Sequence, residues 1–193
     1  IPLWELRLAN VREVGQVLQQ RYEGQFANLI AECQGSAVRL ADRISQEFVS
    51  FCDEATYQGH RIRLLKRAQI TVVDVWGALR DQAARSLVAF QDLDQLTAFA
   101  DYKIPQVLRT LGILRYSDPL AQLVDNRREI PAGSSQEVEI RAAMIWAVEW
   151  IRQALVEGGW SVTAHELDWV LWNIGQEKLP DERPYHRTRT VFY

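Results

Sequence analysis

The sequence predicts an all-α protein: a single helical domain with one short β-hairpin. Three observations lead to this prediction. Apolar residues recur at steps of three and four through most of the chain, helix-capping residues precede several apolar runs, and only one segment combines turn and strand signals. A chain of 193 residues is long enough for one well-packed core, so we expect one domain over residues 1–193.

Two amphipathic helices are expected near the N-terminus. The first covers ELRLANVREVGQVLQQRY, and its apolar residues share one helical face that we expect to pack on the core: Leu8, Val11, Val14, Leu18 and Tyr22. The second covers GSAVRLADRISQEF, where Ser36 is a candidate N-cap. Its core-facing residues are Ala37, Leu40, Ala41, Ile44 and Phe48.

The middle of the chain is expected to form the hairpin and then a buried helix. The segment TYQGHRIR has a turn signal at Gly59 between short strand-like stretches. The following β-branched run could be read as a strand, but its length and spacing favour a helix. The apolar positions that give this spacing are Leu64, Ala68, Val72, Val75, Trp76 and Leu79.

The clearest helix starts lie in the C-terminal half. Ser134 and Glu137 have the spacing of a capping box before a long apolar run that ends at glycines. Thr163 and Glu166 repeat the same spacing before HELDWVLW. We therefore expect helices beginning at these two positions.

The charge balance narrows the classes of partner. A formal net charge of -3 gives no global field that would attract nucleic-acid phosphates or anionic lipid, so any anion site must be local. No apolar run is long enough to span a bilayer and the first residues lack a signal-peptide pattern, so we expect a cytoplasmic protein without membrane or direct nucleic-acid partners. Because the chain starts IPLWEL and its only methionine is Met144, we interpret it as a fragment or a processed chain.

Metal and cofactor chemistry is not expected. The three histidines, His60, His165 and His186, are too scattered to form a convincing ligand set. Cys33 and Cys52 lack metal-ligand spacing as well, and we interpret both as reduced structural residues.

The segment FADYKIPQVLRTLGIL places one acid, Asp101, just before a proline-containing apolar helix. Pro105 suits the first turn of that helix and biases Ile104 toward an extended conformation. Asp101 then has two readings. It can cap the helix through backbone N–H groups, or it can be a catalytic carboxylate held poorly solvated among Phe99, Tyr102 and Ile104. Composition does not decide between them.

Several blocks, taken in order, resemble one known family. They are LLKRAQITVVDVWGAL, FADYKIPQVLRTLGILRYSD, EVEIRAAMIWAVEWI, LDWVLW and PYHRTRTVFY, and the earlier REVGQVL, FANLI, GSAVRL and FCDEATYQG match as well. Together they are similar to the queuosine salvage family, the queuosine 5′-phosphate N-glycosylases. The resemblance implies a helical fold similar to that of helix-hairpin-helix DNA glycosylases. It also implies hydrolysis of the N-glycosidic bond of queuosine 5′-monophosphate, which releases queuine and ribose 5-phosphate so that queuine can be reused in tRNA modification.

The resemblance also implies site residues. In this family the acid of FADY is the catalytic carboxylate, which is Asp101 here, and a lysine at the position of Lys66 lies in the active site. The alternative for Lys66 is a solvated helix residue. We expect the substrate to contact Phe99, Tyr102, Gln106, Asp168, Trp172, His186 and Arg187.

Two groups among these residues suggest how the substrate is held. Asp168 and Trp172 lie at i and i+4, where the acid can accept hydrogen bonds from an amine or diol and the indole can stack on a base. Ordinary core packing is the alternative for Trp172. His186, Arg187 and Arg189 form the only dense cationic group near a chain end and are candidates for binding the 5′-phosphate, with simple exposure as the alternative.

Family members usually carry a further N-terminal segment that lines the pocket, and this chain lacks it. That segment and the nucleotide are the partners that we expect. The alternative function is a non-catalytic helical module that binds a nucleobase or a partner helix through its tryptophan-rich face. Such a module needs no ionised carboxylate at the entrance of its binding site, whereas the hydrolase does. The role of Asp101 therefore distinguishes the two functions. DNA glycosylase activity is disfavoured by the acidic balance and the lack of an extended basic stripe.

Overall fold

A computed structural model describes residues 2–177 and 181–193. Within these residues the chain is mostly helical, with eight α-helices and one two-stranded sheet, which confirms the predicted helical class with a hairpin. The chain forms two compact units. One contains the residues through Asp53, Leu65–Leu96 and Phe192, and the other contains Glu54–Leu64, Thr97–Val191 and Tyr193.

The N-terminal unit is built on the packing of α3 against α4. Its helices are α1 (Trp4–Arg21), α2 (Phe26–Glu32), α3 (Ala37–Glu47) and α4 (Lys66–Leu79), with short 3₁₀ turns η1 (Val49–Phe51), η2 (Arg85–Val88) and η3 (Leu93–Gln95). The Ser36 hydroxyl accepts a hydrogen bond from Arg39 N at 3.0 Å, as the predicted cap requires. The predicted core face of α3 is also confirmed, because each of its apolar residues is buried: Ala37, Leu40, Ala41, Ile44 and the adjoining Phe48.

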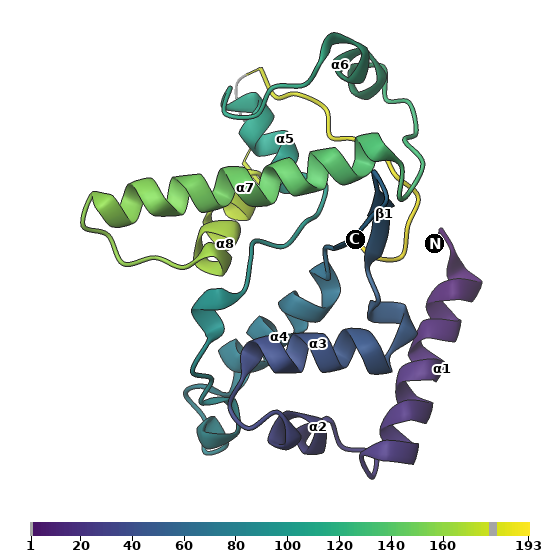
Figure 1. The fold of residues 1–193 in the computed structure, drawn as a ribbon, viewed down its shortest axis with the longest axis vertical. Helices are drawn as coiled ribbons and strands as arrows, with labels where there is room; N and C mark the ends of the chain where they lie inside the picture. The colour runs from purple at the N-terminus through teal and green to yellow at the C-terminus, as the bar shows by residue number, and fades with distance from the viewer. Residues whose placement is uncertain (1, 178–180) are drawn as a thin grey trace. The chain divides into compact units, whose positions relative to one another are not determined.

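Helix α1 forms where predicted, but its packing differs from the prediction. None of its residues is buried, and Val11 is 71% exposed, so the expectation of a core-facing helix is wrong. The helix lies along the edge of its unit with η1 as its main neighbour (Figure 1). One specific contact is the Glu13 carboxylate, which accepts a hydrogen bond from Ser50 N at 3.3 Å. Only Tyr22, after the helix end, reaches the core.

The second unit combines the hairpin with four helices. Strands β1 (Glu54–Tyr57) and β2 (His60–Arg63) pair antiparallel around a turn in which Gly59 has a positive φ, as predicted. The helices are α5 (Lys103–Thr110), α6 (Asp118–Asp125), α7 (Ser135–Glu157) and α8 (Ala164–Ile174). Helix α7 packs against α5, α8 and β1. The buried core between these elements is Leu64, Ala98, Ala100, Ile104, Val107, Leu108, Met144, Ala147, Val148, Leu167 and Leu171.

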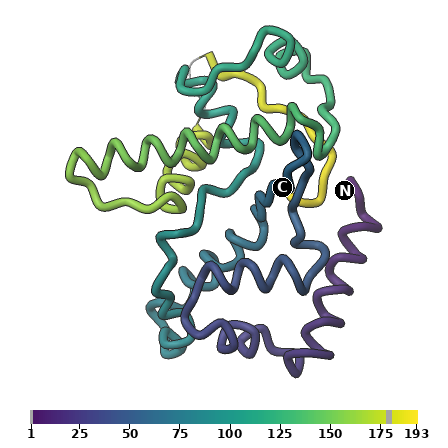
Figure 2. The backbone as a smooth tube through the Cα atoms, viewed as in Figure 1, coloured from purple at the N-terminus to yellow at the C-terminus, as the bar shows by residue number. Residues whose placement is uncertain are grey.

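Capping residues determine where α7 and α8 begin. Thr163 and Glu166 make both hydrogen bonds of a capping box at the start of α8. At the start of α7 the Ser134 hydroxyl accepts from Glu137 N, but the Glu137 carboxylate accepts from Gly133 N rather than from the N-cap residue. The chain turns back through glycines after α7, so α7 and α8 form a helical hairpin (Figure 2).

Helix α5 begins earlier than its proline suggests. Pro105 is the third helical residue, and Ile104 is helical rather than extended, so that expectation is wrong. The reason is that the first four N–H groups of a helix have no intrahelical acceptor, which lets proline occupy the third position without losing a bond. The Asp101 carboxylate accepts from the two N–H groups just before Pro105.

Candidate active site

Asp101 ends a segment without regular secondary structure that leads into α5. The three residues before it (98–100) are buried, and Asp101 itself is 8% exposed. Its Oδ1 accepts hydrogen bonds from Lys103 N at 2.8 Å and Ile104 N at 3.1 Å. The capping interpretation is therefore confirmed. Capping does not exclude catalysis, because backbone donors at a helix N-terminus fix a carboxylate in place and favour its negative charge.

The backbone beside Asp101 is held by two buried charged side chains. Phe99 N donates a hydrogen bond to Asp168 Oδ2 of α8 at 2.7 Å. Arg141 Nε of α7 donates to the carbonyl oxygen of Ala100 at 2.9 Å. Asp168 and Arg141 are 4% and 3% exposed, so neither bond competes with bulk water. The three consecutive residues 99–101 are thus each fixed by a polar contact to a helix.

Arg141 is in turn positioned by the end of the chain. Its guanidinium lies 3.1 Å from Glu137 Oε1, one helical turn earlier, and 4.5 Å from the centre of the Tyr193 ring. The Tyr193 hydroxyl donates to the same Glu137 oxygen at 2.9 Å, and Gly133 N donates to the other oxygen at 3.1 Å. Burial raises the pKa of Tyr193 well above its usual range, so this hydroxyl keeps its proton. We call Glu137, Arg141 and Tyr193 the clamp.

His186 lies beside the clamp and is 1% exposed. Its Nε2 is 3.3 Å from the Tyr193 hydroxyl, and its Nδ1 has no hydrogen-bond partner among the described residues. Burial, and then the positive charge of Arg141, lower the pKa of His186 to about 4. The ring is therefore neutral near pH 7 and offers a phosphate no positive charge.

This burial predicts an acid-sensitive fold. The His186 pKa of about 4 lies below the usual 6.5, so the unfolded chain takes up a proton that the buried ring does not. The neutral buried ring therefore contributes about 3 kcal/mol to the free energy of unfolding above pH 6.5. This contribution is lost as the pH falls from 6.5 toward 4. Urea unfolding at several pH values, for the parent and a His186→Gln variant, measures it. We expect a steeper fall for the parent, and parallel curves would contradict the prediction.

Aromatic rings gather around Tyr102, the residue that follows Asp101. The Tyr102 ring is 5.0 Å from the Tyr185 ring and 6.5 Å from the Tyr193 ring, measured between centroids. Tyr102 and Tyr185 are both partly exposed. Burial raises the pKa of Tyr102, and the nearby Asp101 and Tyr185 raise it further. Tyr102 is thus placed to contact a ligand with a protonated hydroxyl.

Gln106 binds protein groups rather than facing open solvent. Its side-chain amide donates to Glu182 Oε1 at 3.0 Å and to the carbonyl oxygen of Arg183 at 2.7 Å. Its own carbonyl accepts from Lys103 Nζ at 3.0 Å. Gln106 therefore ties the C-terminal segment to α5, and it also lines a polar pocket of about 450 Å³ together with Arg187.

Asp168 and Trp172 share α8 but differ in environment. The Asp168 carboxylate is buried and binds Phe99 N, whereas Trp172 is 45% exposed. Trp172 is therefore not an ordinary core residue. The Phe99 side chain is buried, so its ring is not exposed beside Asp101.

The buried hydrogen bond of Asp168 gives a second prediction. Asp168→Asn keeps an oxygen that can accept from Phe99 N, so we expect the melting temperature to stay within a few degrees. Asp168→Ala leaves the buried Phe99 N–H without this acceptor and should lower the free energy of unfolding by about 1–3 kcal/mol. Thermal and urea unfolding measure the two effects. Equal stability of Asp168→Ala and the parent would contradict the prediction.

Lys66 lies in the N-terminal unit, where it is the first residue of α4. Its backbone N donates to Asp53 Oδ2 at 3.2 Å, and its side chain is partly buried. The positive charge of Lys66 opposes the burial that raises the pKa of Asp74. Lys66 is therefore not a freely solvated residue, and its active-site role stays a prediction.

The cationic group at the chain end is separated by the fold. Arg187 is exposed and lines the polar pocket, and its carbonyl oxygen accepts from Ile130 N at 2.7 Å. Arg189 pairs with Glu129 at 3.8 Å instead. His186 is buried and neutral, as described above. Of the three residues, Arg187 alone is placed as an exposed cation at this pocket.

Sequence reasoning did not identify the clamp. Its signal is two opposite charges at i and i+4, Glu137 and Arg141, inside the apolar run EVEIRAAMIWAVEWI. Charged residues are almost never fully buried unless they are paired, so such a pair on the core face of a helix indicates a specific structural role. The contribution of Tyr193 has no comparable signal, because it depends on the tertiary fold.

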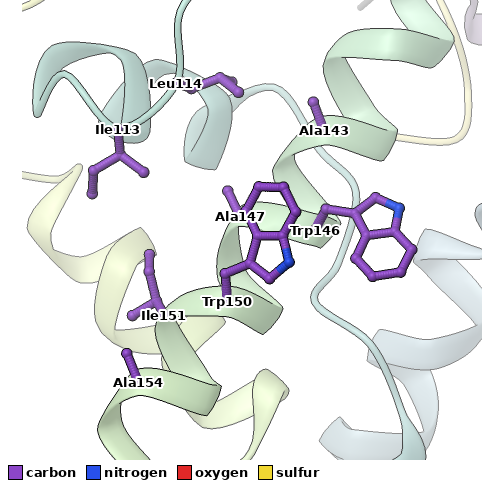
Figure 3. A pocket seen from close by; sticks show the side chains of 8 residues that line it. All are labelled: Ile113, Leu114, Ala143, Trp146, Ala147, Trp150, Ile151 and Ala154. Atoms are coloured by element: carbon purple, nitrogen blue, oxygen red, sulfur yellow. The ribbon is translucent and has the colours of Figure 1, made fainter.

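A second pocket of the same unit is apolar and shares no lining residue with the polar pocket. It has a volume of about 660 Å³ and is lined by Ile113, Leu114, Ala143, Trp146, Ala147, Trp150, Ile151 and Ala154. Figure 3 shows Ile113 and Leu114 on the segment after α5 and the other side chains along α7. Both indoles are more than half exposed. The pocket contains no charged group and none of the predicted site residues.

Comparison with known proteins connects this geometry with one family. Residues 1–193 match the family model described as queuosine salvage protein. A queuosine 5′-phosphate N-glycosylase/hydrolase of Sphaerobacter thermophilus is 51% identical over 193 residues, which cover 100% of this chain and 59% of that protein. Proteins with the same name from Dictyostelium discoideum and Mus musculus are 40% and 37% identical and also cover 100% of this chain. This chain spans 59% of the length of each of these relatives.

Proposed function

The chain belongs to the queuosine salvage protein family, and from that premise we propose that it hydrolyses the N-glycosidic bond of queuosine 5′-phosphate. Water adds to C1′ of the ribose, and the electron pair of the broken carbon–nitrogen bond leaves with the base, which takes up a proton. The products are queuine and ribose 5-phosphate, so that the base becomes available for tRNA modification. The names of three relatives support this substrate and this reaction.

The observation that carries the proposal is the fixed carboxylate of Asp101. As the base leaves, the ribose becomes oxocarbenium-like and positively charged. A carboxylate held by Lys103 N and Ile104 N stabilises that charge without having to reorganise. The same group can also attack the cation or activate water against it. The buried bonds to Phe99 and Ala100 support this role, because they restrict the backbone that carries the acid.

The other predicted residues have roles around this acid. Lys66 is a proposed active-site residue, as the matching lysine of the family implies, and Tyr102 contacts the substrate beside the acid. Asp168 and Trp172 recognise the polar substituent and the flat ring of queuine. The remaining proposed contacts are those of Phe99, Gln106, His186 and Arg187.

The wider organisation follows from the family. We propose a fold similar to helix-hairpin-helix DNA glycosylases, a single catalytic domain over residues 1–193, and a chemistry that uses no metal or cofactor. No helix in the described part of the chain combines the length and the apolar character that crossing a membrane requires. We also propose a cytoplasmic location, no direct nucleic-acid partner, and a contribution to the pocket from the further N-terminal segment of family members.

Release of free queuine tests the proposed function. The complete protein is incubated with queuosine 5′-phosphate, and the products are separated by chromatography and identified by mass. We expect queuine and ribose 5-phosphate in equal amounts. A folded protein that binds the nucleotide and returns it intact would contradict the proposal.

A second candidate is the non-catalytic helical module. The apolar pocket with Trp146 and Trp150 favours it, because exposed indoles often mark binding surfaces. Base recognition needs convergent polar groups, and the lining residues of this pocket supply none beyond the indole N–H groups. A partner helix therefore suits this pocket better than a nucleobase. The queuine release experiment separates the two functions.

A further inference from the structure

The start of α4 has a strained backbone at a buried residue. Leu65 precedes Lys66 and adopts the left-handed conformation, with φ 48° and ψ 34°. This conformation is rare for a residue other than glycine. Of the seven non-glycine residues with a positive φ in the described part of the chain, Leu65 alone is buried. Such a conformation persists only where the surrounding contacts enforce it.

Asp53 supplies two of these contacts. Its carbonyl oxygen accepts a hydrogen bond from Leu65 N at 3.1 Å, and its Oδ2 accepts from Lys66 N at 3.2 Å. Asp53 is 2% exposed, so bulk water does not compete for either bond. Acidic side chains are almost never buried to this extent without partners, and the first N–H groups of a helix are favourable partners for a carboxylate.

The next residue of α4 is held by the same segment of the chain. Arg67 Nη1 donates to the carbonyl oxygen of Ser50 at 3.0 Å, and its guanidinium lies 4.4 Å from the centre of the Phe51 ring. The three consecutive residues 65–67 are thus each tied to residues 50–53. The first turn of α4 is therefore fixed from one side by a short, continuous segment.

The backbone of Lys66 is held in the same manner as that of Asp101, because residues 99–101 are also each fixed by a polar contact. The Lys66 ammonium has no hydrogen bond or ion pair within residues 2–177 and 181–193, which leaves its donors for a ligand. We propose that Asp53 is a positioning residue for Lys66. By holding the strained turn, Asp53 fixes the direction in which the lysine side chain leaves α4. This inference rests on the proposed function, in which Lys66 belongs to the active site.

Single-turnover release of queuine tests the proposal, with the complete protein in excess over queuosine 5′-phosphate so that slow rates remain measurable. Asp53→Ala removes the acceptor of Lys66 N, and we expect the rate per folded molecule to fall by roughly 10-fold to 100-fold. Asp53→Asn keeps an oxygen for that N–H but loses the charge, so we expect a smaller fall of about threefold to fivefold. Rates equal to that of the parent would overturn the proposal.

A double-mutant cycle separates the positioning of Lys66 from a general effect on the fold. In a Lys66→Met background, both Asp53 substitutions should lower the rate no further, because the group that Asp53 positions is absent. Asp92 offers the matched control, since its carboxylate accepts from Ala37 N at 2.6 Å at the start of α3 in the same unit. We expect Asp92→Ala to keep the parent's rate per folded molecule. Equal losses for Asp53→Ala and Asp92→Ala, or a loss that persists in Lys66→Met, would overturn the proposal.

The chemical reactivity of Lys66 gives a readout that needs no turnover. Acetylation by an N-hydroxysuccinimide ester, followed by mass spectrometry of the peptides, gives the rate at Lys66 and, as an internal reference, at Lys103. In Asp53→Ala we expect Lys66 to react at least about twofold faster, because the turn opens locally, and Lys103 to react as in the parent. Unchanged reactivity of Lys66 would overturn the proposal. If the parent releases no queuine, the proposed function fails, while acetylation still decides whether Asp53 holds Lys66.

Discussion

Replacing Asp101 with Asn is expected to lower the rate of queuine release by at least about 10²–10⁴-fold. The change removes the negative charge and keeps the size of the side chain. In the proposed reaction, loss of that charge deprives the oxocarbenium-like ribose of its electrostatic partner and the attacking water of its base. Nucleotide binding should persist, because an amide still hydrogen-bonds a ribose hydroxyl. Turnover and substrate affinity, measured on the same preparation, separate the two effects.

Stability provides the control for this change. In Asp101→Asn the new amide oxygen can accept from Lys103 N and Ile104 N as the carboxylate does, and Asn caps helices about as well as Asp. Unfolding in urea should therefore give the same free energy as for the parent. Asp101→Ala loses the cap and should be less stable by about 1 kcal/mol. A large loss of stability in Asp101→Asn would show that its slower queuine release results from loss of folded protein.

Arg141→Met is expected to lower the free energy of unfolding by about 3–5 kcal/mol. Arg141 pairs with buried Glu137 and donates to the Ala100 carbonyl oxygen, so the change leaves a buried charge without its cation and a buried acceptor without its donor. Because Ala100 precedes Asp101, the surviving folded protein should also turn over more slowly. Urea unfolding measures the first effect, and the turnover number per folded molecule measures the second.

The same helix offers a matched control for Arg141. Arg152 pairs with Glu149 at 2.6 Å near the far end of α7, where both side chains are more than a quarter exposed. Water compensates most of the loss there, so Arg152→Met should cost less than about 1 kcal/mol. Equal losses for the two variants would contradict the clamp.

Elements determined by neighbouring residues could be predicted from the sequence. The caps at Ser36, Ser134 and Thr163 each involve atoms within three residues, and all three helices begin there. The hairpin at Gly59 is equally local. Helices α2 and α6 are not predicted individually, because seven or eight residues repeat an apolar pattern too few times.

Features determined by tertiary packing could not be predicted in the same way. The apolar face of α1 has the periodicity of a buried helix, but burial depends on what packs against it, and Val11 stays exposed. The burial of His186 reverses the expectation from its basic neighbours, because a neutral ring lies where the sequence indicates a cation. Asp101 combines the two kinds of feature. Its cap involves neighbouring residues, whereas the contacts of Arg141 and Asp168 that position its backbone come from distant helices.

The measurement that tests the central claim most directly is single-turnover release of queuine from queuosine 5′-phosphate, by the parent and by Asp101→Asn at equal concentrations of folded protein. The account predicts free queuine from the parent, and a rate at least about 10²-fold lower from the variant. Release by the variant within a few-fold of the parent would contradict it. Asp101 would then be a helix cap alone, and the cleavage would need another catalytic group.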